Sequence, residues 1–248
     1  SILFVPQIFD VGIKPLEWVT PAPVNERVSF EGGGHRLEAD VYRPGAEGEF
    51  PAVLLFLGVA PADAKDPRIA KLGEALARSG LVSLFYWSSQ MSEGDIDVGD
   101  IANLVAAFKF LQDREYVDEE RTGMGGFCVG ASFVLIAASD KQIRDQVAFI
   151  NLFGPYFDLR DVVVSVASEQ TAYGGTLRPW VPDRLTHSTL RNHLTKDLAL
   201  NEGDAVRNLV NSESSLDHTD VYWSAEGLAV YRLLSGVSDV DAEELLNE

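Results

Sequence analysis

The first 157 residues alternate between two hydrophobic patterns, one typical of strands and one typical of helices. Near the start, apolar and polar residues alternate over 28–30 and 37–41, on either side of Gly32-Gly33-Gly34, which predicts an antiparallel hairpin. Further along, short apolar or glycine-rich runs favour strands buried on both faces of a sheet; these runs lie at 51–57, 81–87, 122–127 and 147–153.

Segments with helical spacing separate these runs. Apolar residues three or four apart over 69–76 are followed by Gly80, a residue type that commonly ends a helix. A second apolar face spans 101–111, and small residues at 129–138 indicate a third helix. Because alternating strands and helices are the signature of right-handed βαβ crossovers, we predict an α/β fold with a mostly parallel sheet and helices on both faces.

The remaining residues have a different pattern. From 158 to 248 the periodic segments are helical, and they span 185–200, 205–210, 221–234 and 240–246. The first 25 residues hold four prolines and show no periodicity. We therefore predict an extended arm over 1–25, an α/β core over 26–157 and a helical cap or lid over 158–248.

Charge excludes several classes of function. The chain of 248 residues has 20 Lys and Arg against 38 Asp and Glu, a formal net charge of −18. Nucleic-acid binding depends on clustered basic side chains and anionic membranes attract them, so neither partner is expected. No apolar run has the 18 or so residues of a membrane span. We expect a cytoplasmic protein, with removal of a signal or anchor before Ser1 left open.

Cysteine usage limits the chemistry further. Cys128 is the single cysteine, so an intrachain disulfide is impossible, and one thiol with four histidines cannot form a cysteine-rich zinc module. No metal or organic cofactor is expected.

The same cysteine lies in the segment that carries the most chemistry. Gly126-Phe127-Cys128-Val129-Gly130 places a nucleophile between glycines two before and two after it, at the junction of a predicted strand and helix. This is the spacing of a nucleophile elbow, in which a sharp turn brings the flanking positions too close for Cβ atoms. A helix N-terminus also favours a thiolate. The alternative is a buried structural cysteine in a tight turn.

An elbow needs backbone donors for the oxyanion of the intermediate. The run 51–57 ends at Gly58, and the Val59 N–H, together with that of Val129, is placed to form such a hole. An ordinary turn at the end of a strand is the other interpretation of Gly58.

Residues 26–157 resemble the α/β-hydrolase superfamily, within it the dienelactone hydrolase-like group, whose elbow often contains Cys. The matching parts are the two strands at 26–43, Leu57-Gly58-Val59, the segment 117–121 and the elbow through Ser132. The resemblance implies hydrolysis of carboxylic esters, lactones or thioesters through an acyl-enzyme. It implies Cys128 as nucleophile and Val59 and Val129 as oxyanion donors, acting on a small-molecule acyl substrate.

The sequence departs from that group in three places. No His precedes Gly58, and Leu55 and Phe56 stand where the dienelactone enzymes carry a Glu. The family's later acid and histidine motifs are absent, so we expect the C-terminal strands to be missing from this chain. The alternative function is a catalytically incomplete scaffold or fragment used for binding. An exposed half-sheet of this kind would favour association, and a homo-oligomer is left open.

Four histidines are the remaining candidates for a base. His187 and His193 lie in the predicted helical layer and are the candidate bases, although an ordinary helix histidine is the alternative for each. Their spacing of six puts them on different helix faces, which excludes a metal pair. His35 is expected in a hairpin turn far from the carboxyl edge of the parallel strands, and His218 at a helix N-terminus.

Two further groups have a functional and a structural interpretation. Asp158 and Asp161 follow the last predicted strand and either approach Cys128 or cap a helix. An aromatic cluster either lines an acyl pocket beneath the cap or attaches the cap to the body; its members are Tyr173, Trp180, Tyr222, Trp223 and Tyr231.

Overall fold

The computed structural model describes residues 14–59, 64–212, 223–236 and 242–246. The chain divides into two compact units. The first comprises residues 1–93 and 97–156, and the second comprises 94–96 and 157–248.

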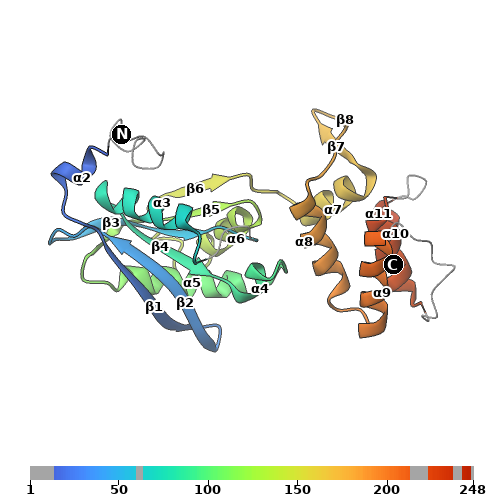
Figure 1. Ribbon diagram of the computed structural model, residues 1–248, viewed down its shortest axis with the longest axis horizontal. Helices are drawn as coiled ribbons and strands as arrows, with labels where there is room; N and C mark the ends of the chain where they lie inside the picture. The colour runs from blue at the N-terminus through green and yellow to red at the C-terminus, as the bar shows by residue number, and fades with distance from the viewer. Residues whose placement is uncertain (1–13, 60–63, 213–222, 237–241, 247–248) are drawn as a thin grey trace. The chain divides into compact units, whose positions relative to one another are not determined.

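The first unit is built on a six-stranded sheet in the order β1-β2-β4-β3-β5-β6 (Figure 1). β1 and β2 form an antiparallel hairpin and β2 runs antiparallel to β4, whereas β3, β4, β5 and β6 pair in parallel. The strands are β1 (Val24–Gly32), β2 (His35–Arg43), β3 (Phe50–Phe56), β4 (Val82–Trp87), β5 (Val117–Phe127) and β6 (Ile150–Phe153). The predicted mixed, mostly parallel sheet is confirmed.

Helices cover both faces of this sheet. α3 (Pro67–Arg78) connects β3 to β4 in one direction across the sheet, whereas α5 (Asp100–Gln112) and α6 (Val129–Ala138) connect strands in the opposite direction. Right-handed crossovers in opposite directions lie on opposite faces, and α5 and α6 accordingly pack side by side. The predicted layers are confirmed. Two short helices, α2 (Leu16–Val19) and α4 (Ser89–Ser92), complete the described part of this unit.

Local sequence explains where α3 begins and ends. The Asp66 carboxylate accepts the Arg68 backbone N–H at 2.8 Å, and Pro67 occupies the first helical position, where its missing N–H costs nothing. Two residues past the helix, Gly80 has a φ of 85°, a conformation that glycine adopts without strain.

The hairpin register corrects the expectation for His35. Glu38 lies opposite Trp87 in the antiparallel pair of β2 and β4. His35 is three residues before Glu38 and therefore lies beyond the carboxyl end of β4. The hairpin turn is thus at the carboxyl edge of the parallel strands, not far from it, because an antiparallel neighbour brings its amino end to that edge.

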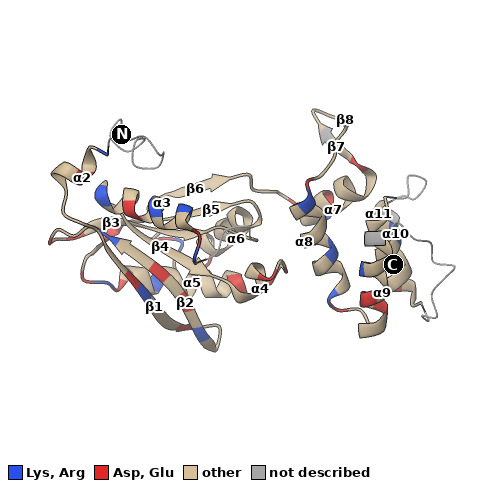
Figure 2. Ribbon diagram, in the orientation of Figure 1, with Lys and Arg blue, Asp and Glu red and all other residues tan. Residues whose placement is uncertain are grey.

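β6 forms one edge of the sheet and differs from the other strands in charge. Its four residues, Ile-Asn-Leu-Phe, carry no charge, whereas charged residues are spread over β1, β2 and α3 (Figure 2). Phe149, Ile150 and Phe153 are each more than 40% exposed. The strand is shorter than the apolar run 147–153 that predicts it, since only its last four residues pair with β5.

The second unit is mainly helical. Its helices are α7 (Leu159–Ser168), α8 (Arg184–Thr195), α9 (Leu200–Ser212), α10 (Ala225–Leu234) and α11 (Ala242–Leu245). They enclose a core of their own, in which Val206, Leu190 and Leu233 are buried. The expected periodic segments at 185–200, 205–210, 221–234 and 240–246 all contain helix, with different boundaries, and residues 221–222 and 240–241 lie outside the described residues.

A hairpin in this unit was not expected from the sequence. β7 (Gln170–Tyr173) pairs antiparallel with β8 (Thr176–Pro179) across Gly174 and Gly175, whose φ angles are 58° and 76°. Two successive positive φ angles are the requirement of a tight hairpin turn. The Gly-Gly pair therefore indicates a hairpin turn in the sequence, but the strands on either side are too short to show an alternating pattern.

None of the helices in the described part of the chain is long and apolar enough to span a membrane.

Candidate active site

Cys128 has the backbone of a nucleophile elbow. It connects β5 to α6 with φ 54° and ψ −134°, a region that non-glycine residues rarely occupy and that costs of order 1–3 kcal/mol. The residue is exposed. This disagrees with the alternative interpretation of Cys128 as a buried structural cysteine. Strain of this kind persists only where the surrounding packing enforces it.

The glycine before Cys128 is required by that packing. A Cβ on Gly126 would lie 2.6 Å from the Cα of Ala131 and 2.7 Å from the Gly130 carbonyl oxygen. No real Cβ approaches backbone this closely, so the turn closes only with glycine at 126. The steric prediction made from the spacing of the motif is met at this position.

The glycine after Cys128 has a different neighbour, the turn that follows β3. A Cβ on Gly130 would lie 2.6 Å from the Gly58 nitrogen, and a Cβ on Gly58 would lie 2.8 Å from the Gly130 nitrogen. Gly58 also has a φ of 75°, which glycine adopts without strain. Backbone contact between the two glycines places the Gly58–Val59 turn directly against the first turn of α6.

This contact bears on the two proposed oxyanion donors. Val129 is the first residue of α6, where a backbone N–H has no carbonyl partner within the helix. Val59 follows Gly58 in the turn packed on that helix end and is buried. The N-terminal N–H groups of a helix favour negative charge beside them, and α6 has no acidic residue in its first turn.

The segment after β6 is also attached to the elbow. The Cys128 backbone N–H donates to the Phe153 carbonyl at 2.9 Å. On α6, the Ser132 hydroxyl accepts the Tyr156 N–H at 3.0 Å and donates to the Tyr156 carbonyl at 2.9 Å. Burial raises the pKa of the Tyr156 phenol to about 12, with a smaller electrostatic contribution from Cys128. Tyr156 was not predicted from the sequence; the serine within an otherwise apolar helix was the available signal.

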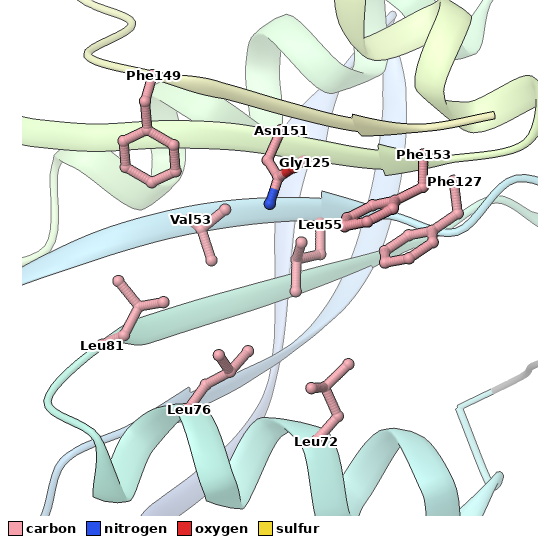
Figure 3. A pocket seen from close by; sticks show the side chains of 10 residues that line it. All are labelled: Val53, Leu55, Leu72, Leu76, Leu81, Gly125, Phe127, Phe149, Asn151 and Phe153. Carbon is pink, nitrogen blue, oxygen red and sulfur yellow. The ribbon is translucent and has the colours of Figure 1, made fainter. Parts of the chain in front are cut away.

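An apolar groove lies along the sheet face covered by α3. It has a volume of 310 Å³, and Asn151 is the one polar side chain among its lining residues. Figure 3 shows Phe127 and Phe153 side by side at one end of the groove, and Phe149 and Leu81 on opposite sides of its other end. The rings of Phe127 and Phe153 stack with centroids 4.9 Å apart, so the residue before the nucleophile lies at the end of this groove.

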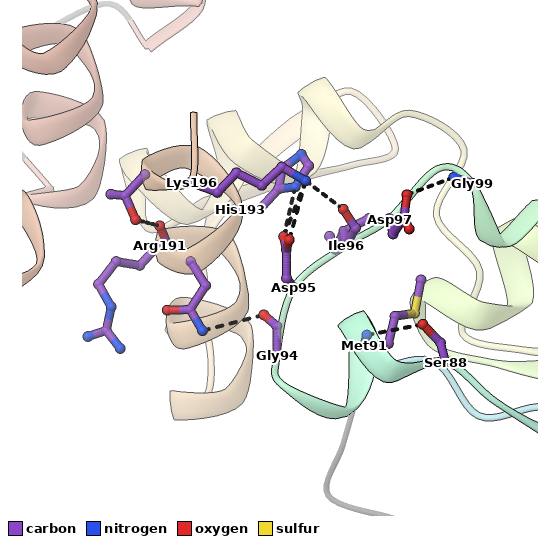
Figure 4. Close-up of polar contacts among 12 residues, drawn as sticks. Ser88, Met91, Gly94, Asp95, Ile96, Asp97, Gly99, Arg191, His193 and Lys196 are labelled. Carbon is purple, nitrogen blue, oxygen red and sulfur yellow. Dashed lines mark hydrogen bonds and ion pairs between the residues drawn. The ribbon is translucent and has the colours of Figure 1, made fainter. Parts of the chain in front are cut away.

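The two candidate bases are in the second unit, on α8. The Nδ1 atom of His193 lies 3.5 Å from an Asp95 carboxylate oxygen, and Lys196 Nζ lies 3.3 Å from the same oxygen (Figure 4). Lys196 also donates to the Ile96 carbonyl at 2.9 Å. His187 is half-buried on the same helix. The segment 94–96 is thus held on α8 by polar contacts, and His193 has a carboxylate beside one ring nitrogen.

The other histidines fall elsewhere. His35 is exposed, with Nδ1 3.3 Å from the Gly33 carbonyl, and it is the single histidine in the sequence of the first unit. His218 lies outside the described residues.

Asp158 caps a helix. Its carboxylate accepts the Arg160 backbone N–H at 2.8 Å at the start of α7, which confirms the capping interpretation, and Asp161 is an exposed residue in the first turn of that helix.

The aromatic residues of the second unit divide into two groups. Trp180, Trp223 and Tyr231 pack against the unit's own core, whereas Tyr173 is exposed beneath the Arg178 guanidinium. Tyr222 lies outside the described residues. An acyl pocket at these residues stays a prediction.

Among the described residues, no group of three or more His, Cys, Asp or Glu side chains is arranged to hold a metal ion.

Similarity to known proteins is found among solved structures and not among sequences. The sequence matches no protein-family model and no curated protein sequence. Solved structures similar to it include a hyperthermophilic esterase from the archaeon Pyrobaculum calidifontis, with 21% identity over 58% of this chain and 45% of that one and a TM-score of 0.42. The α/β-hydrolase GrgF from Penicillium sp. sh18 is 24% identical over 58% of this chain and 48% of that one, with a TM-score of 0.45.

A third similar structure is the dienelactone hydrolase-like promiscuous phosphotriesterase P91 from metagenomic libraries. It is 21% identical over 48% of this chain and 54% of that one, with a TM-score of 0.38. This chain therefore spans about half the length of the solved structures it matches.

Proposed function

We propose that the chain carries the nucleophilic part of a hydrolase for carboxylic esters, lactones or thioesters, with Cys128 as nucleophile. The observation that supports this most is the elbow itself: an exposed thiol on strained backbone, beside a helix end and a glycine turn packed together. More specifically, we propose a dienelactone hydrolase-like enzyme that acts on small acyl substrates.

The reaction divides into two steps. The Cys128 thiolate attacks the acyl carbonyl carbon, and the N–H groups of Val59 and Val129 hold the oxyanion that forms. The carbon–oxygen bond to the leaving group then breaks, which leaves a thioester on Cys128 and an alcohol once the leaving group gains a proton. Water attacks the thioester, the carboxylic acid departs and the thiol is restored. No cofactor is needed in either step.

The proton carrier is a separate part of the proposal. His187 and His193 stay the candidate histidine bases, and the Asp95 carboxylate lies 3.5 Å from His193 Nδ1 without a hydrogen bond between them. His193→Ala should then slow turnover more than His187→Ala. Equal rates for both variants and the unsubstituted protein would exclude these two histidines as the carrier.

Intact-protein mass spectrometry tests the nucleophile directly. Because Cys128 is the single cysteine, incubation with p-nitrophenyl butyrate should add one butyryl group, at Cys128, together with release of p-nitrophenolate. Cys128→Ala should abolish both signals, and Cys128→Ser is the matched control that keeps a weaker nucleophile in the same turn. Release that persists in Cys128→Ala would contradict the proposal.

Alkylation provides a second measurement. Iodoacetamide at mild pH should modify Cys128 faster than it modifies free cysteine, because the thiolate is the reacting form and a helix N-terminus favours it. A rate no higher than that of free cysteine would contradict the proposal that the Cys128 nucleophile is activated.

A binding scaffold is the second candidate function. It is supported by the first unit having a single histidine, His35, which is exposed and faces a backbone carbonyl. In this alternative the protein holds an acyl ligand, alone or as a homo-oligomer, without turnover. Absence of both the acyl adduct and ester hydrolysis would support it, and an adduct that turns over would exclude it.

A further inference from the structure

The first unit contains a second cavity, which is lined mainly by polar side chains. It has a volume of 530 Å³ and is formed by three segments: the start of β2 at 35–38, the end of β4 with the residues after it at 86–92, and the start of α5 with the residues before it at 97–103. None of its described lining residues belongs to the elbow or to the apolar groove. A molecule bound there would therefore contact side chains that the proposed hydrolysis does not use.

Two buried side chains near the start of α5 form part of the cavity wall. Asp100 is 2% exposed and Asn103 is 3% exposed. The Asp100 Oδ1 atom accepts the Tyr86 hydroxyl at 2.6 Å and the Asn103 amide at 3.1 Å. The same amide also donates to the Tyr86 oxygen at 3.1 Å. The donor hydrogens of these side chains are therefore all used within the network.

One oxygen on each of the two buried residues lacks a donor. Asp100 Oδ2 and Asn103 Oδ1 have no hydrogen-bond partner among the described residues. Burying a polar oxygen without a donor is unfavourable, and for a carboxylate oxygen the cost is larger. Both residues line the cavity, so a molecule held in it can supply the donors that the protein does not.

The charges around the cavity favour a cation. Its described lining contains three carboxylates, those of Glu38, Asp97 and Asp100, against one guanidinium, that of Arg36. The Arg36 guanidinium donates to Ser29 Oγ on β1, a residue outside the described lining. A concave site with one dominant sign of charge attracts ligands of the opposite sign.

The Tyr86 phenol cannot balance these carboxylates. Burial raises its pKa well above the usual value, and the charges of Asp100 and Asp97 act in the same direction. The phenol therefore stays neutral and keeps its proton on the bond to Asp100 Oδ1.

An organic cation fits these groups better than a metal ion. Among the described residues, no three His, Cys, Asp or Glu side chains are arranged to hold a metal. An ammonium group, in contrast, carries three hydrogen-bond donors and no acceptor, which matches a wall whose unpartnered atoms are both acceptors.

We propose that this cavity binds a small primary amine in its ammonium form, with the ammonium group donating to Asp100 Oδ2. Asn103 Oδ1 is a second acceptor in the same wall, and the carboxylates of Glu38 and Asp97 attract a further positive charge on the ligand. Trp87, which also lines the cavity, provides an apolar surface for the alkyl part. The site goes beyond the proposed hydrolase and does not depend on it.

Isothermal titration calorimetry of the full chain with 1,4-diaminobutane at neutral pH tests the proposal. The diamine should bind with one molecule per chain. The control ligand is 1,4-butanediol, which has the same length and polar ends but no charge. It should bind at least about tenfold more weakly, because hydrogen bonds to charged groups are the stronger ones.

Asp100→Asn removes the charge and keeps an oxygen for the Tyr86 hydroxyl. The Kd of the diamine should rise at least about tenfold in this variant. Asp118→Asn is the matched control: it removes a carboxylate of the same unit that pairs with Arg121 and lies outside the described lining. Its Kd should equal that of the unsubstituted protein.

Asp97→Asn keeps the test decisive if Asp100→Asn does not fold, as judged by circular dichroism. An amide at 97 can still accept the Gly99 N–H, which the carboxylate accepts at 2.8 Å, while one negative charge of the cavity is removed. The Kd of the diamine should rise about threefold, the effect of a partly exposed charge.

Three outcomes would overturn the inference. They are absence of diamine binding, equal affinities for the diamine and the diol, and an unchanged Kd in a folded Asp100→Asn or, where that variant does not fold, in Asp97→Asn. Failure of the proposed hydrolase is separate, since it would show as a missing acyl adduct on Cys128 and would leave the calorimetry unaffected.

Discussion

At the scale of single residues, the elbow is determined by three glycines. Gly126 contacts the backbone of α6, and Gly58 and Gly130 contact each other. A Cβ on Gly126 would collide with the first turn of α6, and a Cβ on Gly58 or Gly130 would separate that turn from the Gly58–Val59 turn. The strained φ of Cys128 is consistent with this packing, because neighbouring backbone segments hold the turn from both sides.

Gly130→Ala is the residue-scale prediction. The new Cβ would meet Gly58 N at 2.6 Å and the Phe56 carbonyl at 2.8 Å, so the turn carrying Val59 must move. We expect ester turnover to fall by about 100-fold, the effect of losing one oxyanion donor, as measured by p-nitrophenolate release.

Gly80→Ala is the control for this prediction. Gly80 also has positive φ, but a Cβ there would meet nothing within 4 Å, so the substitution should cost about 1–2 kcal/mol of stability and leave turnover unchanged. Equal turnover in the two variants would show that the contact between Gly58 and Gly130 does not hold the site.

At the scale of elements, side-chain caps decide where several helices begin. Asp66, Asp158 and Asp183 each accept first-turn N–H groups, at α3, α7 and α8. Buried capping also occurs in the second unit: the Glu202 carboxylate accepts the Ser224 N–H at 2.6 Å at the start of α10. The caps define helices whose apolar faces then form the cores.

The Asp183 cap should make the stability of α8 depend on pH. Its carboxylate accepts the N–H groups of Leu185 and Thr186 at 2.8 and 3.0 Å, and these bonds lower its pKa in the folded protein. The stabilisation is therefore complete above the pKa of an unfolded aspartate and is lost as pH falls through the lower, folded value. Asp183→Ala should cost about 1 kcal/mol at neutral pH, and this cost should shrink as pH falls through the lowered pKa of Asp183 in the folded protein.

Urea unfolding followed by circular dichroism measures this difference. Asp183→Asn is the control, since an amide caps nearly as well without titrating, so its stability relative to Asp183→Ala should not vary with pH. A cost of Asp183→Ala that stayed constant from neutral to acid pH would contradict the role of the charged cap.

At the scale of the whole molecule, the chain has two separate cores. In the first unit Leu54, Phe85 and Leu104 are fully buried, and the second unit has its own buried cluster around Val206 and Leu233. Each core buries its own helices, so each unit has an independent source of stability.

Leu233→Ala should therefore lower the stability of the second unit alone. The cavity should cost the second unit about 2–5 kcal/mol, while the rate of Cys128 alkylation stays that of the unsubstituted protein. Leu104→Ala is the matched substitution in the first unit and should cost a similar amount there. A single unfolding transition shifted equally by both substitutions would show instead that the two cores unfold together.

Much of the fold is local and was predictable for that reason. The helices α3 and α5 follow from apolar residues at helical spacing, α6 follows from a run of small residues, and the buried strands follow from short apolar or glycine-rich runs. The hairpin at 170–179 was missed because four-residue strands carry no alternation. The edge reached by His35 was predicted wrongly, because it depends on the direction of β2 relative to β4 and not on either strand alone.

By itself, the sequence determined the position and the spacing of the elbow, since Gly126, Cys128 and Gly130 meet within a single turn of backbone. Only the tertiary structure brought Gly58 against Gly130, Tyr156 to Ser132 and Asp95 to His193. The physical reason is that periodicity records which face of an element is buried, whereas a contact between segments far apart in the chain depends on how the elements pack and leaves no periodic signal in either segment.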